Sequence, residues 1–374
     1  MKIALIIFPL HPSHGCILQT YALYYTLKKK GHDVTIVNRQ WAAPSLLGYL
    51  KRIGKNMYLR LFHGYKGAIF YEGAYPKSNM VELNAFIEKY LKADTITVYN
   101  ERALKELSHI HFDAYIVGSD QTWRPKYVPN IYNYYLNFIP SGNKVKRISY
   151  AASFGTEDWE YNQIQEDICR KLISKFSAIS VREDSGIKIC RDYFYVNAQL
   201  VVDPTLLLTL EEYKDLVNYT SVGSDNSLSC YLLDRTINKE DVIEYVSRVK
   251  GLIPVYVNTE TENSFAELSK QIAPSIETWI GGFIRAEFVV TDSFHAMLFS
   301  ILFNKPFIVI GNRKRGITRF VSFLNSIGLE ERLVSDISDI TLELINKTVD
   351  WEFVNNQISS QRRKSINFLM DALK

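Results

Sequence analysis

Short apolar runs alternate with helical patterns along this chain, and that alternation limits the possible folds more than any other sequence feature. Residues 2–8 form a continuous apolar run, residues 19–30 carry helical apolar spacing, and residues 34–37 form a second apolar, β-branched run. A strand, a helix and another strand within about 40 residues are typical of a βαβ unit in a parallel sheet. The pattern therefore predicts an α/β fold.

The alternation continues in two sets of elements. The first set adds predicted strands at 114–117, 147–151, 178–181 and 200–202, and predicted helices at 81–91 and 161–176. The second set has predicted strands at 229–233, 253–257, 288–291 and 307–310, and predicted helices at 239–250, 277–281 and 294–303. We expect two Rossmann-like domains, residues 1–205 and 206–350, that face a cleft. The last helix, within residues 351–374, is expected to return to the first domain.

Composition and charge exclude several classes of protein. The chain has 374 residues, of which 47% are hydrophobic and 22% charged, as in soluble two-domain proteins rather than disordered or fibrous ones. A net charge of +4 provides no overall field for nucleic acid, so no nucleic-acid partner is expected. The four cysteines are too far apart for a zinc or redox motif and too few for a disulfide framework. We expect free thiols in a reducing compartment.

No stretch has the length of a signal peptide core or of a membrane span. The predicted location is therefore the cytoplasm. Residues 41–71 contain five basic residues, no acidic one and several interleaved aromatic residues. This pattern fits a peripheral contact of residues 47–70 with the inner face of the cell membrane. An ordinary basic helix or a groove for an acidic acceptor fits it equally well.

Ligands of parallel sheets bind beyond the carboxyl ends of the strands, so we searched the segments that follow predicted strands. None carries the glycine pattern of a dinucleotide site or of a P-loop, which argues against both ligands. Residues 118–123 follow one strand and offer Ser119, Asp120, Gln121 and Trp123. They form either a simple turn above a core tryptophan or a sugar- or anion-binding loop in which Trp123 stacks on the ligand.

The loop after the first strand, residues 12–19, is a second place where a hydroxyl-rich ligand or an anion can bind. His14 and Gln19 are its candidate contacts. Cys16 is not expected to be a nucleophile, because no third group that would orient a cysteine–histidine pair can be named.

The predicted strand 288–291 leads directly into an apolar helix through Asp292 and Ser293, residue types that favour helix N-caps. The free N–H groups and the dipole of that first turn form a potential anion site. His295 falls in this turn, where an imidazole can exchange protons near pH 7. A lone histidine is more often structural, so both roles stay open.

A multiply charged anion bound without a metal needs fixed cations, and arginine binds carboxylate or phosphate in a bidentate way. Arg182 follows the predicted strand 178–181, and Arg313, Arg315 and Arg319 follow the strand 307–310. Neighbouring acids can equally neutralise Arg182, and residues 313–315 can equally form a solvated loop. No cluster of histidines and carboxylates indicates a metal, so none is expected.

Six motifs in order resemble the polysaccharide pyruvyl transferase family over residues 1 to about 330. They are residues 1–40 with Gly15, Leu18-Gln19 and Tyr21-Ala22-Leu23, then 118–123, 149–155, 180–183, 202–207 and 291–296. The resemblance implies a fold similar to the GT-B glycosyltransferases. It also implies transfer of a pyruvyl group from phosphoenolpyruvate to a sugar diol as a cyclic ketal, with release of phosphate and no other cofactor. The acceptor would belong to a surface polysaccharide, such as a capsule, or to its lipid-linked precursor.

The resemblance puts the family's histidine on His295 and its arginine on Arg182. With the strand-end analysis it gives three groups of residues: catalytic His295, Arg182 and Asp120; donor-binding Ser293, Phe294, Arg313, Arg315 and Arg319; and acceptor-binding His14, Gln19, Ser119, Gln121 and Trp123. Many members carry Arg-Leu where this chain has Ser293-Phe294, so the later arginines or the helix N-terminus are expected to compensate. The alternatives are a nucleotide-sugar-dependent glycosyltransferase of the same fold and a non-catalytic glycan- or anion-binding relative.

Overall fold

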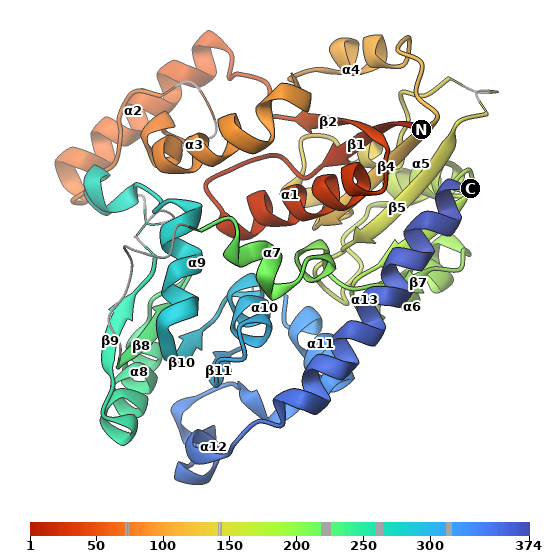
Figure 1. Ribbon diagram of the computed structural model, residues 1–374. Coiled ribbons are helices and arrows are strands. Elements are labelled where there is room, and N and C mark those ends of the chain that lie inside the picture. Colours follow the sequence, from red (N-terminus) through yellow and green to blue (C-terminus); the bar gives the residue numbers. More distant parts are fainter. Residues whose placement is uncertain are drawn as a thin grey trace.

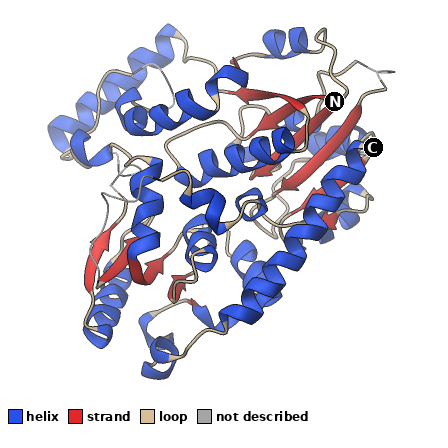
Figure 2. Ribbon diagram, in the orientation of Figure 1, coloured by secondary structure: helices blue, strands red, loops and turns tan. Residues whose placement is uncertain are grey.

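A computed structural model describes residues 1–71, 73, 75–140, 142, 144–217, 226–258, 260, 263, 265–311 and 316–374 (Figure 1). Two separate sheets organise these residues, with the strand orders β3-β2-β1-β4-β5-β6-β7 and β12-β11-β10-β8-β9. Neighbouring strands in both sheets run parallel. Figure 2 shows helices packed around both sheets. The α/β prediction is confirmed.

The first sheet is built around β1, which lies between β2 and β4. Its strands are β1 Lys2–Ile7, β2 Asp33–Arg39, β3 Thr95–Val98, β4 Ala114–Asp120, β5 Lys146–Ala152, β6 Ala178–Val181 and β7 Gln199–Leu200. The helices of this half are α1 His14–Lys29, α2 Leu46–Phe62, α3 Val81–Tyr90, α4 Glu101–Leu107, α5 Gln163–Ile173 and α6 Asp184–Phe194. Because β1 is covered on both faces, all of its residues after Lys2 are buried, which explains its unbroken apolar run.

The second sheet is built around β10, which lies between β8 and β11. Its strands are β8 Ser227–Tyr231, β9 Ile253–Tyr256, β10 Ala286–Thr291, β11 Phe307–Ile310 and β12 Leu333–Val334. The helices that follow the first sheet are α7 Leu210–Lys214, α8 Ile237–Lys250, α9 Ile276–Arg285, α10 Phe294–Leu302, α11 Thr318–Ile327, α12 Leu342–Asn346 and α13 Trp351–Leu373. Every residue of α10 is buried, and all of them except His295 and Ser300 are apolar.

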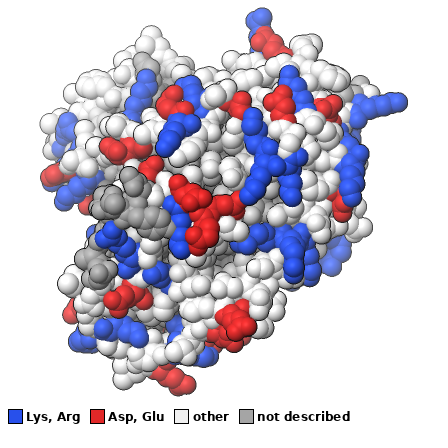
Figure 3. Space-filling model, in the orientation of Figure 1, with Lys and Arg blue, Asp and Glu red and all other residues white. Residues whose placement is uncertain are grey.

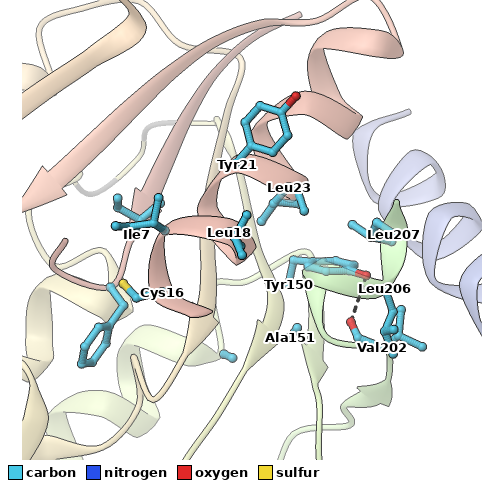
Figure 4. Packing of buried hydrophobic residues seen from close by; sticks show 14 of the residues in the cluster. Ile7, Cys16, Leu18, Tyr21, Leu23, Tyr150, Ala151, Val202, Leu206 and Leu207 are labelled. Atoms are coloured by element: carbon cyan, nitrogen blue, oxygen red, sulfur yellow. Dashed lines mark hydrogen bonds between the residues drawn. The ribbon is translucent and has the colours of Figure 1, made fainter. Parts of the chain in front are cut away.

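The segment that connects the two sheets is fixed in the main hydrophobic core. In Figure 4 Tyr150 of β5 lies between Leu18 of α1 and Leu206 of the short helix Pro204–Leu207. The Tyr150 hydroxyl donates a hydrogen bond to the Val202 carbonyl at 3.2 Å. The carboxyl ends of the first sheet and the start of the second half are therefore held together by packing.

Helix α13 runs from the second sheet back along the first (Figure 1). Its Ser365 hydroxyl accepts a hydrogen bond from the Val202 amide at 3.0 Å. Its Arg362 donates to the carbonyls of Leu206 and Leu208. The last helix thus contacts the connecting segment as well as α11.

Some boundaries differ from the predictions for local physical reasons. Helix α1 begins at His14 rather than residue 19, because the Ser13 hydroxyl caps it and accepts from the Cys16 amide at 3.4 Å. Strand β4 continues through Gly118 to Asp120, so half of the predicted loop 118–123 is strand. A Cβ at Gly118 would lie 2.3 Å from the Tyr150 carbonyl oxygen, and only glycine permits this close pairing.

Candidate active site

The carboxyl ends of β1, β4, β8 and β10 converge on a cavity of about 140 Å³. Its lining combines both halves of the chain and includes Phe8, His11, Ser13, Asp120 and Gln121 from the first half, and Tyr231, Trp279, Ser293, Phe294, His295 and Arg319 from the second. Pockets for drug-sized ligands typically measure about 300–1,000 Å³. The cavity in this conformation therefore suits a small ligand rather than a whole nucleotide sugar.

His295 lies in the first turn of α10, as the sequence predicted, and its ring lines the cavity. The Ser293 hydroxyl caps this helix by accepting from the Ala296 amide at 3.4 Å. The imidazole Nε2 lies 3.7 Å from an Asp203 carboxylate oxygen. On another side the ring abuts Gly15, where a Cβ would lie 2.2 Å from the imidazole Nδ1. The start of α1 and Asp203 thus fix the ring between them.

Arg182 lies behind the cavity at the centre of a buried ionic cluster. Its Nη2 contacts an Asp120 oxygen at 2.6 Å, and its Nη1 contacts an Asp203 oxygen at 2.5 Å. Its Nε lies 3.9 Å from a Glu183 oxygen. The side chain has no exposed surface and does not line the cavity. In this structure its charge is therefore balanced by carboxylates instead of facing a ligand.

The cluster keeps Asp120 and Asp203 ionised in spite of burial, whereas burial raises the pKa of its third acid, Glu183. Burial raises the pKa of Asp120, but the charges of Arg182, His295 and Arg319 outweigh it and lower that pKa to about 2. Burial also raises the pKa of Asp203, and the hydrogen bond and charge of His295 together with Arg182 outweigh it and lower that pKa. For Arg182, burial lowers the pKa, and the nearby carboxylates raise it by more. Two carboxylates and a guanidinium are thus charged at neutral pH.

Arg319 of α11 brings a second guanidinium to the cavity. Its Nη1 lies 3.8 Å from an Asp120 oxygen. Burial, followed by the charge of Arg182, lowers the pKa of Arg319 to about 10, so the group is still protonated at pH 7. Both guanidinium groups contact the Phe294 ring, whose centroid lies 5.1 Å from Arg319 Cζ and 5.2 Å from Arg182 Cζ. Arg313 and Arg315 lie outside the described residues.

Of the residues predicted to bind the acceptor, Gln121 lines the cavity and the other four do not. Ser119 donates a hydrogen bond to the Gln19 side chain at 2.8 Å, and both side chains are buried. Trp123 is completely buried, stacks on Tyr135 and donates its indole N–H to a backbone carbonyl at 3.1 Å. The structure thus puts the predicted stacking face of Trp123 in the core, because the chain turns inward after Asp120.

His14 is a structural contact between the two halves rather than part of the cavity lining. Its Nε2 donates to the Pro274 carbonyl at 2.8 Å, and its ring stacks on Trp279 with 5.2 Å between centroids. Burial lowers the pKa of His14 to about 4, although the hydrogen bond to Pro274 acts in the opposite direction. The ring is therefore neutral at pH 7.

The family model described as polysaccharide pyruvyl transferase matches residues 14–314, which is most of the chain. This chain belongs to the polysaccharide pyruvyl transferase family. A comparison with curated proteins gives no match.

Among solved structures, this pyruvyl transferase family member is similar to a putative UDP-N-acetylglucosamine 2-epimerase from Listeria monocytogenes. The identity is 11% and the TM-score 0.51, over 97% of this chain and 90% of that one. It is also similar to MnaA from S. aureus, solved with UDP, at 15% identity and a TM-score of 0.50 over 96% and 91% of the chains. Likenesses at these identities show the fold alone. The predicted GT-B-like arrangement of two Rossmann-like domains is confirmed.

Two acids that had no predicted site role organise the site of this family member, and Asp292 was predicted only as a helix N-cap residue. Asp203 contacts His295 and Arg182, and its other oxygen accepts from the Thr205 amide at 3.0 Å. Asp292 accepts from the Leu233 amide at 2.6 Å and fixes the segment after β8. Both acids directly follow predicted strands, and this position is the sequence feature that could have indicated a role in the site. Among the described residues, no three His, Cys, Asp or Glu side chains are grouped to hold a metal ion.

Proposed function

We propose that this pyruvyl transferase moves the pyruvyl group of phosphoenolpyruvate onto two hydroxyls of one sugar, forming a cyclic ketal and releasing phosphate. The observation that carries the proposal is that His295 shares a small cavity with the N-terminus of α10 and with Arg319. Phosphoenolpyruvate is a small anion with a carboxylate and a phosphate. A cavity of about 140 Å³ with a helix N-terminus and a guanidinium in its wall suits that ligand in size and charge.

Donor binding is assigned to the groups of the second half. The free N–H groups of the first turn of α10, with the Ser293 hydroxyl, receive one of the two anionic groups. Arg319 receives the other, and Arg313 and Arg315 are assigned to the same task. Phe294 holds the guanidinium of Arg319 through its ring face. Arg182 is assigned a positioning role, because its two bound carboxylates, Asp120 and Asp203, already occupy it.

Proton transfer is assigned to His295 in its protonated form. The imidazolium gives its proton to the C3 methylene of phosphoenolpyruvate, and positive charge develops at C2. The first sugar hydroxyl adds to C2, the bond from C2 to the phosphate oxygen breaks, and the second hydroxyl closes the ketal. One hydroxyl proton restores the imidazolium and the other leaves with the phosphate, so atoms and charges balance. Asp203, 3.7 Å from the imidazole Nε2, stabilises the protonated ring.

We assign binding of the acceptor sugar to the side chains at the carboxyl end of β4. Asp120 has a pKa of about 2, so it is a weak base, and its role here is to accept a hydrogen bond from a sugar hydroxyl. Gln121 lies beside it in the cavity wall. We propose a glycan acceptor from surface-polysaccharide assembly on the cytoplasmic side of the membrane, either polymeric or lipid-linked. The reaction needs no redox step and therefore no further cofactor.

Phosphate release tests the proposal directly. Purified full-length protein is incubated with phosphoenolpyruvate and a panel of soluble glycosides with adjacent hydroxyls, and a pyruvate ketal is sought by mass spectrometry. His295→Ala is expected to lower the rate by about 10²- to 10⁴-fold, because the proton donor is lost. His111→Ala is the matched control, because His111 is 94% exposed.

Ligand-induced thermal shifts provide a measurement that does not depend on the acceptor. Phosphoenolpyruvate is expected to raise the Tm of the wild type, and UDP-N-acetylglucosamine is expected to leave it unchanged. A shift with the nucleotide sugar alone would refute the proposed reaction. Wild-type turnover by folded His295→Ala would remove His295 from the mechanism.

A further inference from the structure

Helix α2 carries two groups of exposed apolar side chains, near its start and its end, that the described chain leaves uncovered. We call these seven side chains, each between 46% and 75% exposed, the α2 face: Leu46, Leu47, Leu50, Met57, Tyr58, Leu61 and Phe62. Within α2 only Asn56 is buried. Single exposed apolar residues are common on protein surfaces, but seven large ones on one helix favour an interaction site.

The spacing of these residues aligns them along one side of the helix. Steps of three or four residues, as from Leu47 to Leu50 and from Met57 to Leu61, keep side chains on one face of an α-helix. The opposite side of α2 forms hydrogen bonds with the segment that follows the helix. There Asn56 donates to the Ala68 carbonyl at 3.2 Å, and Arg60 donates to the Gly67 carbonyl at 2.8 Å. The α2 face therefore points outward because its other side is anchored.

Charge distinguishes between the possible partners of this face. Lys51 and Lys55 lie on α2 and are exposed, and no carboxylate of the described residues pairs with either one. The sequence has no acidic residue from Trp41 to Tyr71. Figure 3 shows the surface over α2, at the upper left, largely as uncharged side chains. Apolar side chains flanked by unpaired lysines complement a bilayer with anionic headgroups. A symmetric pair of α2 faces would instead bring like charges together.

The position of α2 relates the face to the candidate active site. Helix α2 follows β2, whose carboxyl end lies at the same sheet edge as the ends of β1 and β4. Gln40 before α2 and Tyr75 after it both donate to the Leu10 carbonyl, each at 2.7 Å. His11, the next residue, lines the cavity. The segments that flank α2 and the rim of the cavity are thus joined by hydrogen bonds.

We propose that the α2 face docks on an anionic membrane surface, with its apolar side chains at the boundary of headgroups and acyl chains and with Lys51 and Lys55 on the headgroups. Among the described residues no helix is long and apolar enough to cross a bilayer. Docking orients the cavity rim toward the membrane, which favours a lipid-linked glycan as acceptor. That last step rests on the proposed function, whereas docking itself does not.

Vesicle flotation of the full-length protein tests docking. The wild type is expected to float with vesicles of phosphatidylcholine and phosphatidylglycerol, and much less with phosphatidylcholine alone or at high salt. The double variant Leu50→Glu/Leu61→Glu is expected to lose binding. Replacing Lys51 or Lys55 by glutamine is expected to weaken binding to anionic vesicles by roughly fivefold per lysine. Ile237→Glu is the matched control, because Ile237 is 81% exposed on another helix.

Two results would overturn the proposal. The first is a wild type that binds neither vesicle composition. The second is a dimer, detected by light scattering, that Leu50→Glu/Leu61→Glu converts into a monomer without any vesicle binding by the wild type, because the face would then be a subunit interface. Circular dichroism and thermal unfolding verify that each variant is folded. Phosphate release with a soluble acceptor is measured in parallel, so that failed docking with intact turnover refutes only the membrane contact.

Discussion

At the scale of single residues, the arrangement of Arg182 explains how the site is held together. Three acids from different segments meet around one guanidinium with no exposed surface. Removing one partner from a buried ion cluster leaves charges in the interior without compensation, which costs far more than losing an exposed pair. Asp203 links this cluster to His295. Arg182 therefore fixes the orientation of the imidazole indirectly.

Arg182→Met is expected to lower the free energy of unfolding by about 3–5 kcal/mol, because Asp120 and Asp203 lose their common partner. Urea unfolding measures the change. Arg102→Met is the control, because its side chain is 91% exposed and its contact with Glu106 is a surface pair. Arg182→Lys keeps the charge but cannot bind Asp120 and Asp203 through two separate nitrogens. We expect it to lose less stability than Arg182→Met. A stable Arg182→Met protein that fails to bind phosphoenolpyruvate would instead make Arg182 a direct ligand of the donor.

Gly15→Ala tests whether the position of the His295 ring matters for turnover. The added Cβ would lie 2.2 Å from Nδ1 and 2.3 Å from Cγ of the imidazole, so the ring has to move. We expect phosphate release to fall by at least about tenfold, since a displacement of about 1 Å in a catalytic group costs more than this. Gly54→Ala, a helical glycine with no atom within 4 Å of the added Cβ, is the control and is expected to be neutral or slightly stabilising. Unchanged turnover by Gly15→Ala would contradict this account.

The positions of strand ends in the sequence predict part of the cavity lining but not the rest. Asp120, Ser293 and His295 line the cavity because they lie at or just after the carboxyl ends of strands that converge there. Trp123 also follows such a strand but is buried, because successive side chains after a strand point in different directions. Sequence identifies the edge of the sheet, but the direction of each side chain depends on the backbone. The contacts of Asp203 could be recognised only in the folded structure, because its partners come from distant segments of the chain.

At the scale of elements, the first turn of α1 joins the two halves through His14, and this contact responds to pH. Burial lowers the pKa of His14 from 6.5 to about 4, so the unfolded chain takes up the proton more readily than the folded one between these values. Stability is therefore full above pH 6.5 and falls as the pH drops toward 4. At pH 5 the loss from this residue is about 2 kcal/mol.

His14→Gln removes this titration while an amide N–H can still reach the Pro274 carbonyl. Urea unfolding at pH 7 and pH 5 is expected to show a smaller loss of stability for the variant than for the wild type, by about 2 kcal/mol. His111→Gln, at an exposed histidine, is expected to keep the wild-type dependence. An equal loss in His14→Gln and the wild type would show that His14 does not titrate in this range.

The elements themselves were largely predictable because parallel strands covered on both faces are apolar runs with turn residues at each end. Helix α10 could be predicted for the same reason, since its whole surface is buried. The outward direction of the α2 face could not be predicted, because an apolar strip in sequence is the same whether it meets the core or a membrane. The burial of Asn56 shows which side of α2 faces the protein. This residue is the buried one of the helix, and it is polar.

At the scale of the whole molecule, direct contacts close the cleft around the cavity. The Ser322 hydroxyl of α11 donates to an Asp184 oxygen at 2.9 Å, which ties the second half to the start of α6. Nearby, a Cβ on Gly316 would lie 1.8 Å from the Gly155 carbonyl oxygen. This closure brings Arg319 and Asp120 together, and it depends on contacts between residues far apart in sequence. Alternating strands and helices predicted the two domains, but they contain no signal for how tightly those domains meet.

Gly316→Ala is expected to weaken that closure, because the added Cβ would collide with the backbone of Gly155 and the residue has a φ of +95°. Gly328→Ala is the matched control: its φ is +69°, but the nearest atom, from Phe353, is 3.5 Å away, so it shares the backbone strain without the collision. Both variants are expected to lose about 1 kcal/mol of stability from the φ alone. Only Gly316→Ala is expected to show a larger radius of gyration by small-angle scattering and a raised KM for phosphoenolpyruvate. If the two variants behave alike, the approach of Gly316 to Gly155 does not hold the cleft closed.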